Sequence, residues 1–199
     1  MADVNEADLS QRLIDEGARL LAEHGPAGLS LRKLAAAAGT STMAIYSLFG
    51  DKQRLLAAMY REGFRRLGER LRPASAQAPT DALVELGRAY RRSALDGPHL
   101  YGLMFGPRPP DLQPSEADDK AADATYAPLV ENVRAAVEDG TLTGDPERIA
   151  LQLWAVAHGM VSLELADHLP YPADEAAQRY EAALLNAVRP FLAARGTAR

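Results

Sequence analysis

Residues 30–56 read "SLRKLAAAAGTSTMAIYSLFGDKQRLL", a run of small residues followed closely by large aromatic ones. Ser30 stands where the side chain that caps a short helix would be, and Gly39 can end that helix. A second short helix is expected at 42–49. Small side chains at 35–38 let two helix axes cross closely, and Gly39 can adopt the positive φ of a sharp corner. The stretch therefore predicts a helix-turn-helix.

Longer helices are expected on both sides of this motif. Apolar residues recur at helical spacing between positions 7 and 24, and Gly25-Pro26 stops that segment. Asp51 is placed to cap a longer helix that continues towards Leu71. Helices as short as the two in the motif do not persist alone in water. We therefore expect the longer helices to act as their platform.

The composition is that of a helical protein. Hydrophobic residues make up 47% and charged ones 25%, and the residues that favour strands are too scattered to alternate. Including the four segments above, about nine helices are expected. The later ones are placed at 81–95, 98–106, 118–139, 145–168 and 174–194. We therefore predict an all-α fold.

Two proline-containing stretches interrupt the helical pattern. Residues 72–80, "RPASAQAPT", mark a boundary that predicts an N-terminal domain at 1–71 and a C-terminal domain at 72–199. Residues 106–119 contain four prolines, so they cannot form a regular helix. We expect them to form an exposed loop.

The charge is distributed unevenly along the chain. The formal net charge of -5 argues at first against a nucleic-acid partner. Residues 1–70, however, hold ten Lys and Arg against nine Asp and Glu, whereas the remainder holds twelve against eighteen. A surface that binds an anion is therefore expected in the first third of the chain.

The sequence also indicates the compartment. It contains no cysteine, so disulfides and thiolate metal sites are excluded, and a reducing compartment is the natural expectation. The N-terminus is acidic and lacks the apolar run of a signal peptide. The longest apolar stretch, 151–166, is short for a bilayer span and contains Gln152, His158 and Glu164. We therefore predict a cytoplasmic protein with no membrane partner.

The second short helix has the properties of a helix that enters a DNA major groove. Its first residues are small, and Ile45 and Phe49 can anchor its other face. Its N-terminal amides, Ser41 and Thr42 also suit phosphate oxygens. Helix-turn-helix pairs occur in many helical proteins, so spacing alone leaves DNA binding and a purely structural role equally open.

The motif resembles the DNA-binding domain of the TetR-type transcriptional repressors. The resemblance covers residues 7 to about 60 and is carried by Gly25, Leu29, Arg32-Lys33-Leu34-Ala35, Ala38-Gly39, Ser41, Tyr46, Phe49, Lys52 and Leu55-Leu56. It implies that Arg32 reaches a base edge or a phosphate, that residues 42–44 face the groove floor, and that Tyr46 and Lys52 hold the DNA backbone. The implied DNA-binding residues are Ser30, Arg32, Lys33, Thr40, Ser41, Thr42, Met43, Ala44, Tyr46, Ser47 and Lys52.

Two positions depart from the family pattern. The family commonly has glycine or proline where Met43 stands, and threonine or serine where Ala44 stands. Losing a hydroxyl and gaining a thioether is expected to shift recognition towards apolar contacts, for example with thymine methyl groups. The preferred operator sequence therefore stays open.

The C-terminal part resembles a Trp-His-Gly subgroup of the same family, through "LYGLMFG" at 100–106 and Trp154, His158 and Gly159. This likeness implies a helical ligand-binding and dimerisation domain whose last two long helices form a four-helix bundle with a second copy. Helical stripes on these segments agree with it. The expected dimer residues are Leu153, Ala157, Met160, Val161, Tyr180, Leu184, Ala187, Val188 and Phe191. A dimer would place two recognition helices about 34–36 Å apart, in successive major grooves.

A ligand site is expected among aromatic and apolar residues of the C-terminal part. The candidates are Tyr90, Leu100, Tyr101, Met104, Phe105, Tyr126, Trp154 and His158. For each of them an ordinary place in the core is the more common explanation, and for His158 that is a satisfied core histidine. No cofactor or metal is expected, because the sequence lacks a pair of histidines at helical spacing and a glycine-rich phosphate loop.

These patterns together predict a homodimeric, bacterial, ligand-responsive repressor. It would bind palindromic double-stranded operator DNA and be released by a small-molecule inducer. The alternative is a helical homodimer that binds or transforms a small molecule and has a non-functional helix-turn-helix. The sequence contains no catalytic motif, which favours the regulator over the enzyme.

Overall fold

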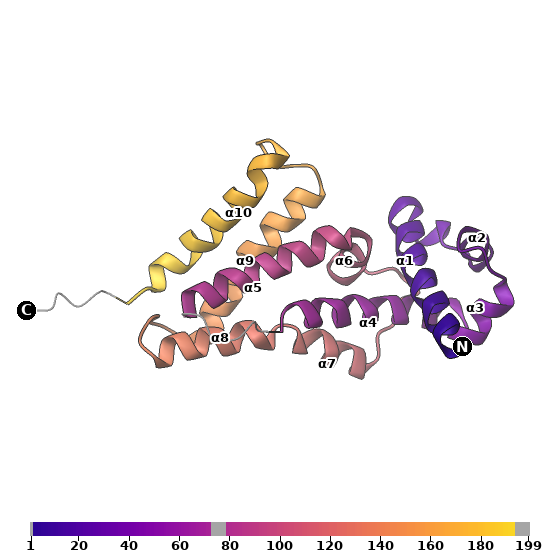
Figure 1. Ribbon diagram of the computed structural model, residues 1–199, viewed down its shortest axis with the longest axis horizontal. Coiled ribbons are helices and arrows are strands. Elements are labelled where there is room, and N and C mark those ends of the chain that lie inside the picture. The colour runs from indigo at the N-terminus through magenta and orange to yellow at the C-terminus, as the bar shows by residue number, and fades with distance from the viewer. Residues whose placement is uncertain (1, 73–78, 194–199) are drawn as a thin grey trace, which may run out of the picture. The chain divides into compact units, whose positions relative to one another are not determined.

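The structure is a computed structural model that describes residues 2–72 and 79–193 (Figure 1). Their side chains are described from residue 6 onward and, after the gap, from residue 80 onward. The described residues contain helices and one isolated β-bridge, Leu142–Leu192, which confirms the all-α fold class. The helices are α1 (Ala2–Gly28), α2 (Leu31–Ala37), α3 (Thr42–Phe49), α4 (Lys52–Arg70), α5 (Pro79–Asp96), α6 (Pro98–Phe105), α7 (Glu116–Ala124), α8 (Ala127–Glu138), α9 (Pro146–Leu165), α10 (Ala173–Val188) and the 3₁₀ turn η1 (Arg189–Phe191).

Prolines explain two differences from the expected helices. The segment expected at 118–139 is divided into α7 and α8, and Pro128 lies in the first turn of α8. Proline is tolerated there but removes an amide that a continuous helix would need. The segment expected at 174–194 leaves α-helical geometry after Val188, two residues before Pro190. The described part of the chain therefore has ten α-helices instead of about nine.

The described chain forms two compact units that do not correspond to a single cut in the sequence. The N-terminal unit contains residues 2–66 and 97–123, and the C-terminal unit contains the other described residues. Helices α6 and α7 thus belong with the helix-turn-helix, although they follow α5 in the sequence. Helix α4 contributes residues to both units.

Apolar side chains of α1 to α4 form the centre of the N-terminal unit. Leu13, Leu34, Ile45, Leu55 and Met59 have no exposed surface. Burying side chains of this size stabilises the unit by about 1.5–3 kcal/mol each. The apolar stripes of α1 and α4, which were expected from the sequence, are therefore buried together with the apolar residues of the two short helices. They form the platform on which α2 and α3 pack.

Helix α6 is joined to α4 by aromatic contacts. The ring centroids of Phe64 on α4 and Phe105 on α6 lie 5.5 Å apart. Within α6, the rings of Tyr101 and Phe105 lie 4.9 Å apart, which orients Phe105. Gly63 permits the close approach, because a Cβ there would meet the sulfur of Met104 at 2.5 Å. A side chain at residue 63 would therefore push α6 away from α4.

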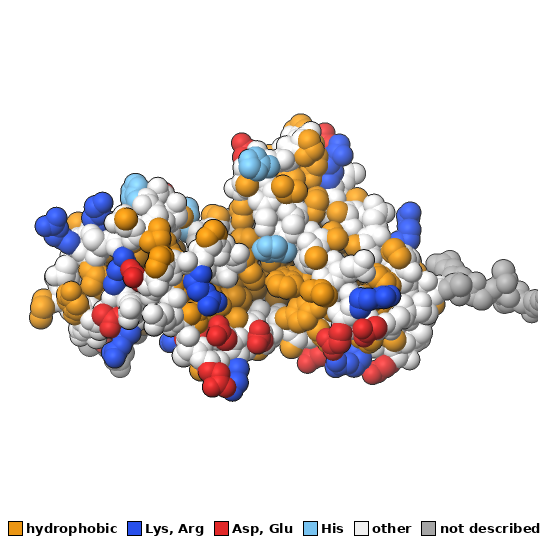
Figure 2. Space-filling model, turned by 180° about the vertical axis from the view of Figure 1, so that it is seen from behind, with side chains coloured by type: hydrophobic (Ala, Val, Ile, Leu, Met, Phe, Trp, Pro, Cys, Tyr) orange, Lys and Arg blue, Asp and Glu red, His pale blue; other side chains and the backbone are white. Residues whose placement is uncertain are grey.

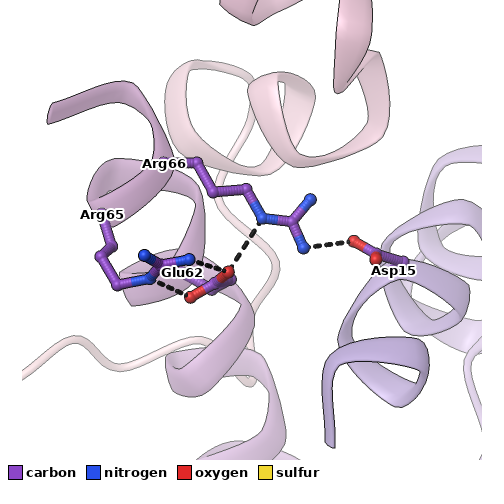
Figure 3. A network of polar contacts seen from close by, with 4 residues as sticks. All are labelled: Asp15, Glu62, Arg65 and Arg66. Atoms are coloured by element: carbon purple, nitrogen blue, oxygen red, sulfur yellow. Dashed lines mark hydrogen bonds and ion pairs between the residues drawn. The ribbon is translucent and has the colours of Figure 1, made fainter. Parts of the chain in front are cut away.

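An ion-pair network joins α1 to α4 (Figure 3). Arg66 Nη2 donates to Asp15 Oδ1 at 2.7 Å and its Nε donates to Glu62 Oε1 at 2.9 Å. Arg65 donates to both oxygens of Glu62, at 2.6 and 2.7 Å. Burial raises the pKa of Glu62, but the two arginines outweigh it and leave the pKa below its ordinary value. Arg66 thus connects α1 to α4, and Arg65 holds the carboxylate of Glu62 that Arg66 also binds.

Asp118 is the buried charged residue among the described side chains, with 3% of its surface exposed. Its Oδ1 accepts from Arg61 Nε at 2.6 Å, and its Oδ2 accepts from Ser115 N at 2.9 Å and Ser115 Oγ at 2.7 Å. These donors, with Arg61 contributing most, lower the pKa of Asp118 from 3.8 to about 2. The carboxylate both caps α7 and holds it against α4.

The C-terminal unit has a core of its own, formed by α5, α8, α9, α10 and η1. Its buried residues are Leu83, Val130, Val133, Ala136, Leu142, Ile149, Ala150, Leu153, Val188 and Phe191. Tyr180 Oη donates to the carbonyl of Gly87 at 2.9 Å. Backbone hydrogen bonds from Thr143 N to Phe191 O and from Ala193 N to Thr141 O, at 2.7 and 3.0 Å, tie the end of the described chain to the α8–α9 loop.

Each helix among the described residues is too short or too polar to span a bilayer.

We expect Asp118→Asn to lower the free energy of unfolding by about 1–2 kcal/mol at pH 7, because it removes the ion pair with Arg61. The folded-state pKa lies below the unfolded one, so this contribution is present above pH 3.8 and is lost as the pH falls towards 2. Urea unfolding of wild type and variant at neutral pH and near pH 3 measures it. The difference should shrink at the lower pH.

Glu116→Gln is the matched control on the same helix, because the carboxylate of Glu116 is 84% exposed and pairs with Lys120 across one turn. It should change stability by a few tenths of a kcal/mol. Equal losses in the two variants, or a difference independent of pH, would contradict the assigned role of Asp118.

Candidate nucleic-acid interface

The turn between α2 and α3 has the predicted geometry. Ser30 Oγ accepts from Lys33 N at 3.2 Å, and Ser41 Oγ accepts from Ala44 N at 3.2 Å, so each short helix has a side-chain cap. Gly39 lies at φ 64°, in the left-handed region that favours glycine. The cap at Ser30 and the glycine corner expected from the sequence are therefore confirmed, and the cap at Ser41 is an additional finding.

Only part of the alanine run is used for close packing. Ala35 is buried, Ala38 is half-buried, and Ala36 and Ala37 are exposed. Thr40 N donates to Ala35 O at 2.9 Å, which closes the turn on the buried side. The interpretation that all four alanines serve helix contact is therefore right for Ala35 and Ala38. It is wrong for Ala36 and Ala37, because their side chains face solvent.

Helix α3 has one anchored face and one free face. Ile45 is fully buried, whereas 75% of Met43 and 53% of Tyr46 is exposed, and both are large hydrophobic side chains. Phe49, expected as a second anchor, is half-buried. An exposed face of this kind on a short anchored helix can be inserted into a groove without breaking the core beneath it.

The structure leaves the surface of every predicted DNA-binding residue at least partly open. The exposed ones are Arg32, Lys33, Ser41, Met43, Tyr46 and Ser47, and the half-buried ones are Ser30, Thr40, Thr42, Ala44 and Lys52. All of them lie in α2, α3, their N-caps, the turn between the two helices, and the first turn of α4. The candidate interface is thus continuous along the sequence.

Basic side chains border this face. Residues 29–54 hold four basic side chains, Arg32, Lys33, Lys52 and Arg54, against the single acid Asp51, a net charge of +3 in a chain of net charge -5. Figure 2 shows blue side chains projecting at the end of the N-terminal unit where α2 lies. The local charge can therefore attract phosphates although the whole chain is acidic.

Lys52 is held in position by two oxygen atoms. Its Nζ donates to the carbonyl of Pro26 at 3.1 Å and lies 3.1 Å from Oδ2 of Asp111. The bond to Pro26 fixes the lysine beside the last turn of α1, just after the kink at Gly25. An ammonium group has three donors, so one remains for a further acceptor.

Sequence reasoning missed two residues near this lysine. Arg54 is exposed, and its guanidinium lies over Gly50, where a Cβ would meet Nη1 at 3.1 Å. Its charge, two residues beyond Lys52, was a signal that could have suggested a further phosphate contact. Asp111 belongs to the loop between α6 and α7, and nothing in the sequence pattern connects it with Lys52.

The candidate ligand residues divide between the two units. Leu100, Tyr101, Met104 and Phe105 lie on α6 in the N-terminal unit, where the last three take part in the contacts of α6 described above. The other four, Tyr90, Tyr126, Trp154 and His158, lie in the C-terminal unit. The two sets are therefore treated as separate clusters.

The second set forms a connected polar and aromatic cluster. Tyr90 Oη lies 3.1 Å from His158 Nδ1, and Ser162 Oγ lies 3.4 Å from His158 Nε2. The rings of Trp154 and Tyr126 lie 5.6 Å apart. Burial lowers the pKa of His158, which keeps the imidazole neutral at pH 7.

Most of the expected dimer residues are covered by the chain itself. Leu153, Ala157, Val161, Tyr180, Leu184, Val188 and Phe191 are at most 8% exposed in the single chain, and only Met160 and Ala187 are half-buried. The helical stripes therefore identified the internal core of the C-terminal unit. Assigning the seven buried residues to a partner's surface does not fit their burial, because a partner would contact faces that the single chain leaves open. The assignment of Met160 and Ala187 stays a prediction.

A capped, glycine-cornered helix pair with an exposed second helix and a basic border defines a helix-turn-helix regulatory protein. Comparison with family models agrees at both ends of the chain. Residues 13–59 match the model of the bacterial regulatory proteins of the tetR family, and residues 83–188 match that of the tetracyclin repressor-like C-terminal domain. The chain belongs to the TetR family. Its members are regulatory proteins, which excludes the enzyme interpretation.

Individual relatives extend this result. The HTH-type transcriptional regulator Rv1816 of Mycobacterium tuberculosis is 28% identical over 141 residues, covering 69% of this chain and 59% of that protein. The HTH-type transcriptional repressor AcnR of Corynebacterium efficiens is 41% identical over 94 residues, 47% of this chain and 44% of AcnR. The match to Rv1816 thus spans about three fifths of that relative's length.

A solved structure shows the same architecture over nearly the whole chain. A protein with unknown function from Rhodococcus sp. RHA1 superposes with a TM-score of 0.73 at 31% identity, covering 92% of this chain and 95% of that one. The likeness thus includes both helical units.

We expect Gly39→Ala to destabilise the N-terminal unit by about 1–2 kcal/mol. A Cβ at residue 39 would meet nothing within 4 Å, so the cost comes from the left-handed backbone alone. Asn adopts this conformation more readily, so Gly39→Asn should lose less. Urea unfolding followed by circular dichroism measures the difference.

Gly102→Ala is the control, because Gly102 lies inside α6 of the same unit and also has open space around its Cβ position. In a helix interior, alanine is more stable than glycine by about 0.5–1 kcal/mol. The Gly102→Ala variant should therefore have the same stability as the wild type or a higher one. If both alanine variants were equally destabilised, the φ of Gly39 would not be the cause.

Proposed function

We propose that this protein is a DNA-binding transcriptional repressor that reads an operator with α3. The observation that carries the proposal is the face of α3, in which Met43 and Tyr46 are exposed while Ile45 is buried beneath them. A large thioether with three quarters of its surface in water costs free energy unless a partner covers it. A major groove floor with thymine methyl groups is a suitable partner.

The surrounding side chains support a division between backbone and base contacts. The Tyr46 hydroxyl and the Lys52 ammonium can bind phosphates, as can the hydroxyl protons of Ser30 and Ser41, whose oxygens cap the helices. Arg32 and Lys33 are exposed on α2 and can add further phosphate or base contacts. Residues 42–44 would read the sequence, with Thr40 and Ser47 beside them.

Dimerisation would use the exposed faces of α9 and α10. Leu163 and Leu185 are 46% and 54% exposed, although both are large apolar residues. A Cβ at Gly159 would meet nothing within 4 Å in the single chain, so that side of α9 is open to a neighbouring helix. A twofold dimer would present two α3 helices to a palindromic operator.

A small-molecule inducer would bind at the cluster of Tyr90, Tyr126, Trp154 and His158. A neutral imidazole and a phenol hydroxyl, together with aromatic rings, favour an uncharged, amphipathic molecule. The charged side chains nearby along the chain, Arg91 and Glu164, already pair with each other at 2.5–2.8 Å. Release requires that the molecule bind the DNA-free arrangement more tightly than the DNA-bound one.

The two family models suggest that the N-terminal and C-terminal parts of the chain have different roles. Residues 1–71 would carry DNA recognition, residues 72–199 would carry ligand binding and dimerisation, and the protein would act in the cytoplasm, where the operator is.

DNA binding should weaken steeply with added salt, because bound phosphates release their counterions. Lys52→Ala should reduce the slope of log K against log salt by about 0.9 for each Lys52 that contacts DNA, or about 1.8 for a dimer, and Tyr46→Phe should weaken binding about 2- to 10-fold on every duplex. Thr42→Ala and Met43→Ala should change which sequence is preferred. Selection from a random duplex library, followed by fluorescence anisotropy at several salt concentrations, measures both effects.

Lys120→Ala removes the same charge from the exposed surface of α7, where Lys120 is 72% exposed and pairs with Glu116. It serves as the control for Lys52→Ala and should leave the slope unchanged. Failure of wild type to bind any duplex would refute the proposed function, and unchanged binding in all four interface variants would refute the site.

We expect the double variant Leu163→Asp, Leu185→Asp to dissociate the dimer while leaving the chain folded. Both side chains are exposed in the single chain, so the charges are harmful only where a partner would bury them. Sedimentation velocity should show a dimer for wild type and a monomer for the variant. Leu192→Asp, at a leucine of similar exposure outside α9 and α10, is the control and should remain dimeric.

A further inference from the structure

The loop between α6 and α7, residues 106–115, is anchored to the first half of α4 within the N-terminal unit. Pro109 and Leu112 are buried, and Leu112 N donates to Pro109 O at 3.0 Å, closing a turn. The Arg108 guanidinium lies 5.9 Å from the centre of the Tyr60 ring. The sequence predicted a non-helical, exposed loop, and the exposure was wrong at these two residues, because their apolar side chains pack inward.

This turn places one carboxylate at the candidate interface. Asp111 lies between the two buried residues of the turn, and its Oδ2 lies 3.1 Å from the Nζ of Lys52. About half of the Asp111 side chain and a third of the Lys52 side chain remain exposed. The anchored turn therefore holds the acid beside the lysine, and water and other ions can still reach both.

We propose that Asp111 is an internal competitor for the DNA phosphate at Lys52, and so a residue that tunes the affinity for DNA. The inference depends on the proposed function, since it assumes that Lys52 binds a phosphate. The Pro26 carbonyl holds Nζ in place whichever anion is present, because it accepts from a separate donor of the ammonium group. A phosphate beside Lys52 would also lie close to the negative Asp111, so the carboxylate has to move away or weaken the contact.

The expected size of the effect follows from the exposure of the pair. Exposed ion pairs contribute little free energy to the structures that they join. The loss of one such pair corresponds to about a 2- to 5-fold change in an equilibrium constant. Removing the carboxylate should therefore tighten DNA binding by about 2- to 5-fold for each Lys52 that contacts DNA. This is large enough for titration and too small to decide whether the protein binds at all.

The test compares Asp111→Asn with Glu116→Gln on a mixed-sequence DNA duplex. Both changes remove one negative charge from the N-terminal unit, but Glu116 pairs with Lys120 on α7 and not with Lys52. Each is also made in a Lys52→Gln background. Fluorescence anisotropy at low and at physiological salt gives the dissociation constants, and thermal unfolding of each variant shows that it is folded.

Asp111→Asn is expected to bind more tightly than Glu116→Gln by about 2- to 5-fold for each Lys52 that contacts DNA, and the advantage should disappear with Lys52→Gln. Equal binding of the two variants would overturn the inference, as would an advantage that persists without the lysine, since that would be a general effect of charge. Weaker binding of Asp111→Asn would also overturn it, because Asp111 would then position the lysine for phosphate.

The experiment also separates this inference from the function on which it rests. If wild type and Glu116→Gln both failed to bind duplex at low salt, the proposed function would fall, and the inference with it. If both bound and Lys52→Gln weakened them, the function would stand whatever Asp111→Asn did.

Discussion

The length of α3 constrains the whole N-terminal unit. An eight-residue helix has no stability of its own in water, because too few hydrogen bonds repay the cost of starting it. It therefore has to be held from one side by Ile45 and capped at its start by Ser41, while its other side stays free. Every exposed residue of α3 depends on that single anchored face. Under the proposed function the platform beneath has to be rigid, because a helix that reads a groove would lose its contacts if it shifted by about an ångström.

The rigidity of this platform comes from more than the three helices of the motif. Phe105 and Met104 fix α6 against α4, the Arg66 network fixes α1 against α4, and Asp118 fixes α7 on Arg61. These contacts explain why α6 and α7 cluster with the helix-turn-helix, although a proline-rich stretch and α5 separate them in sequence. The family models end one domain at residue 59 and begin the next at residue 83, so α6 and α7 fall within the C-terminal model. Sequence descent and spatial packing thus divide the chain differently.

Local features were predictable from the sequence, and long-range ones were not. Caps, the φ of Gly39 and the stripes of α1 and α4 depend on residues a few positions apart, so Ser30 and Asp51 could be assigned correctly as caps. Ser41 also caps its helix, although the sequence suggested only a phosphate contact for it. The partner of a stripe is not local. Tyr180 and Val161 were correctly seen to be apolar and aligned, yet their stripes face the chain's own core and not a second copy. A helical period shows which side is buried and leaves open what buries it.

The pairing of Lys52 with Asp111 is of the same long-range kind, since it joins residues 59 positions apart through an exposed ion pair. Its weakness fits a regulator. Exposed pairs contribute about 0.2–1 kcal/mol each, and a dimer with two such lysines would double the effect on operator binding. The sum, about 0.4–2 kcal/mol, approaches the 1–3 kcal/mol typical of coupling between an effector and its ligand. Under the proposed function, loss of this pair in both subunits would therefore change DNA affinity severalfold without unfolding any helix. A fully buried pair at this position would cost too much to break to serve as such a control.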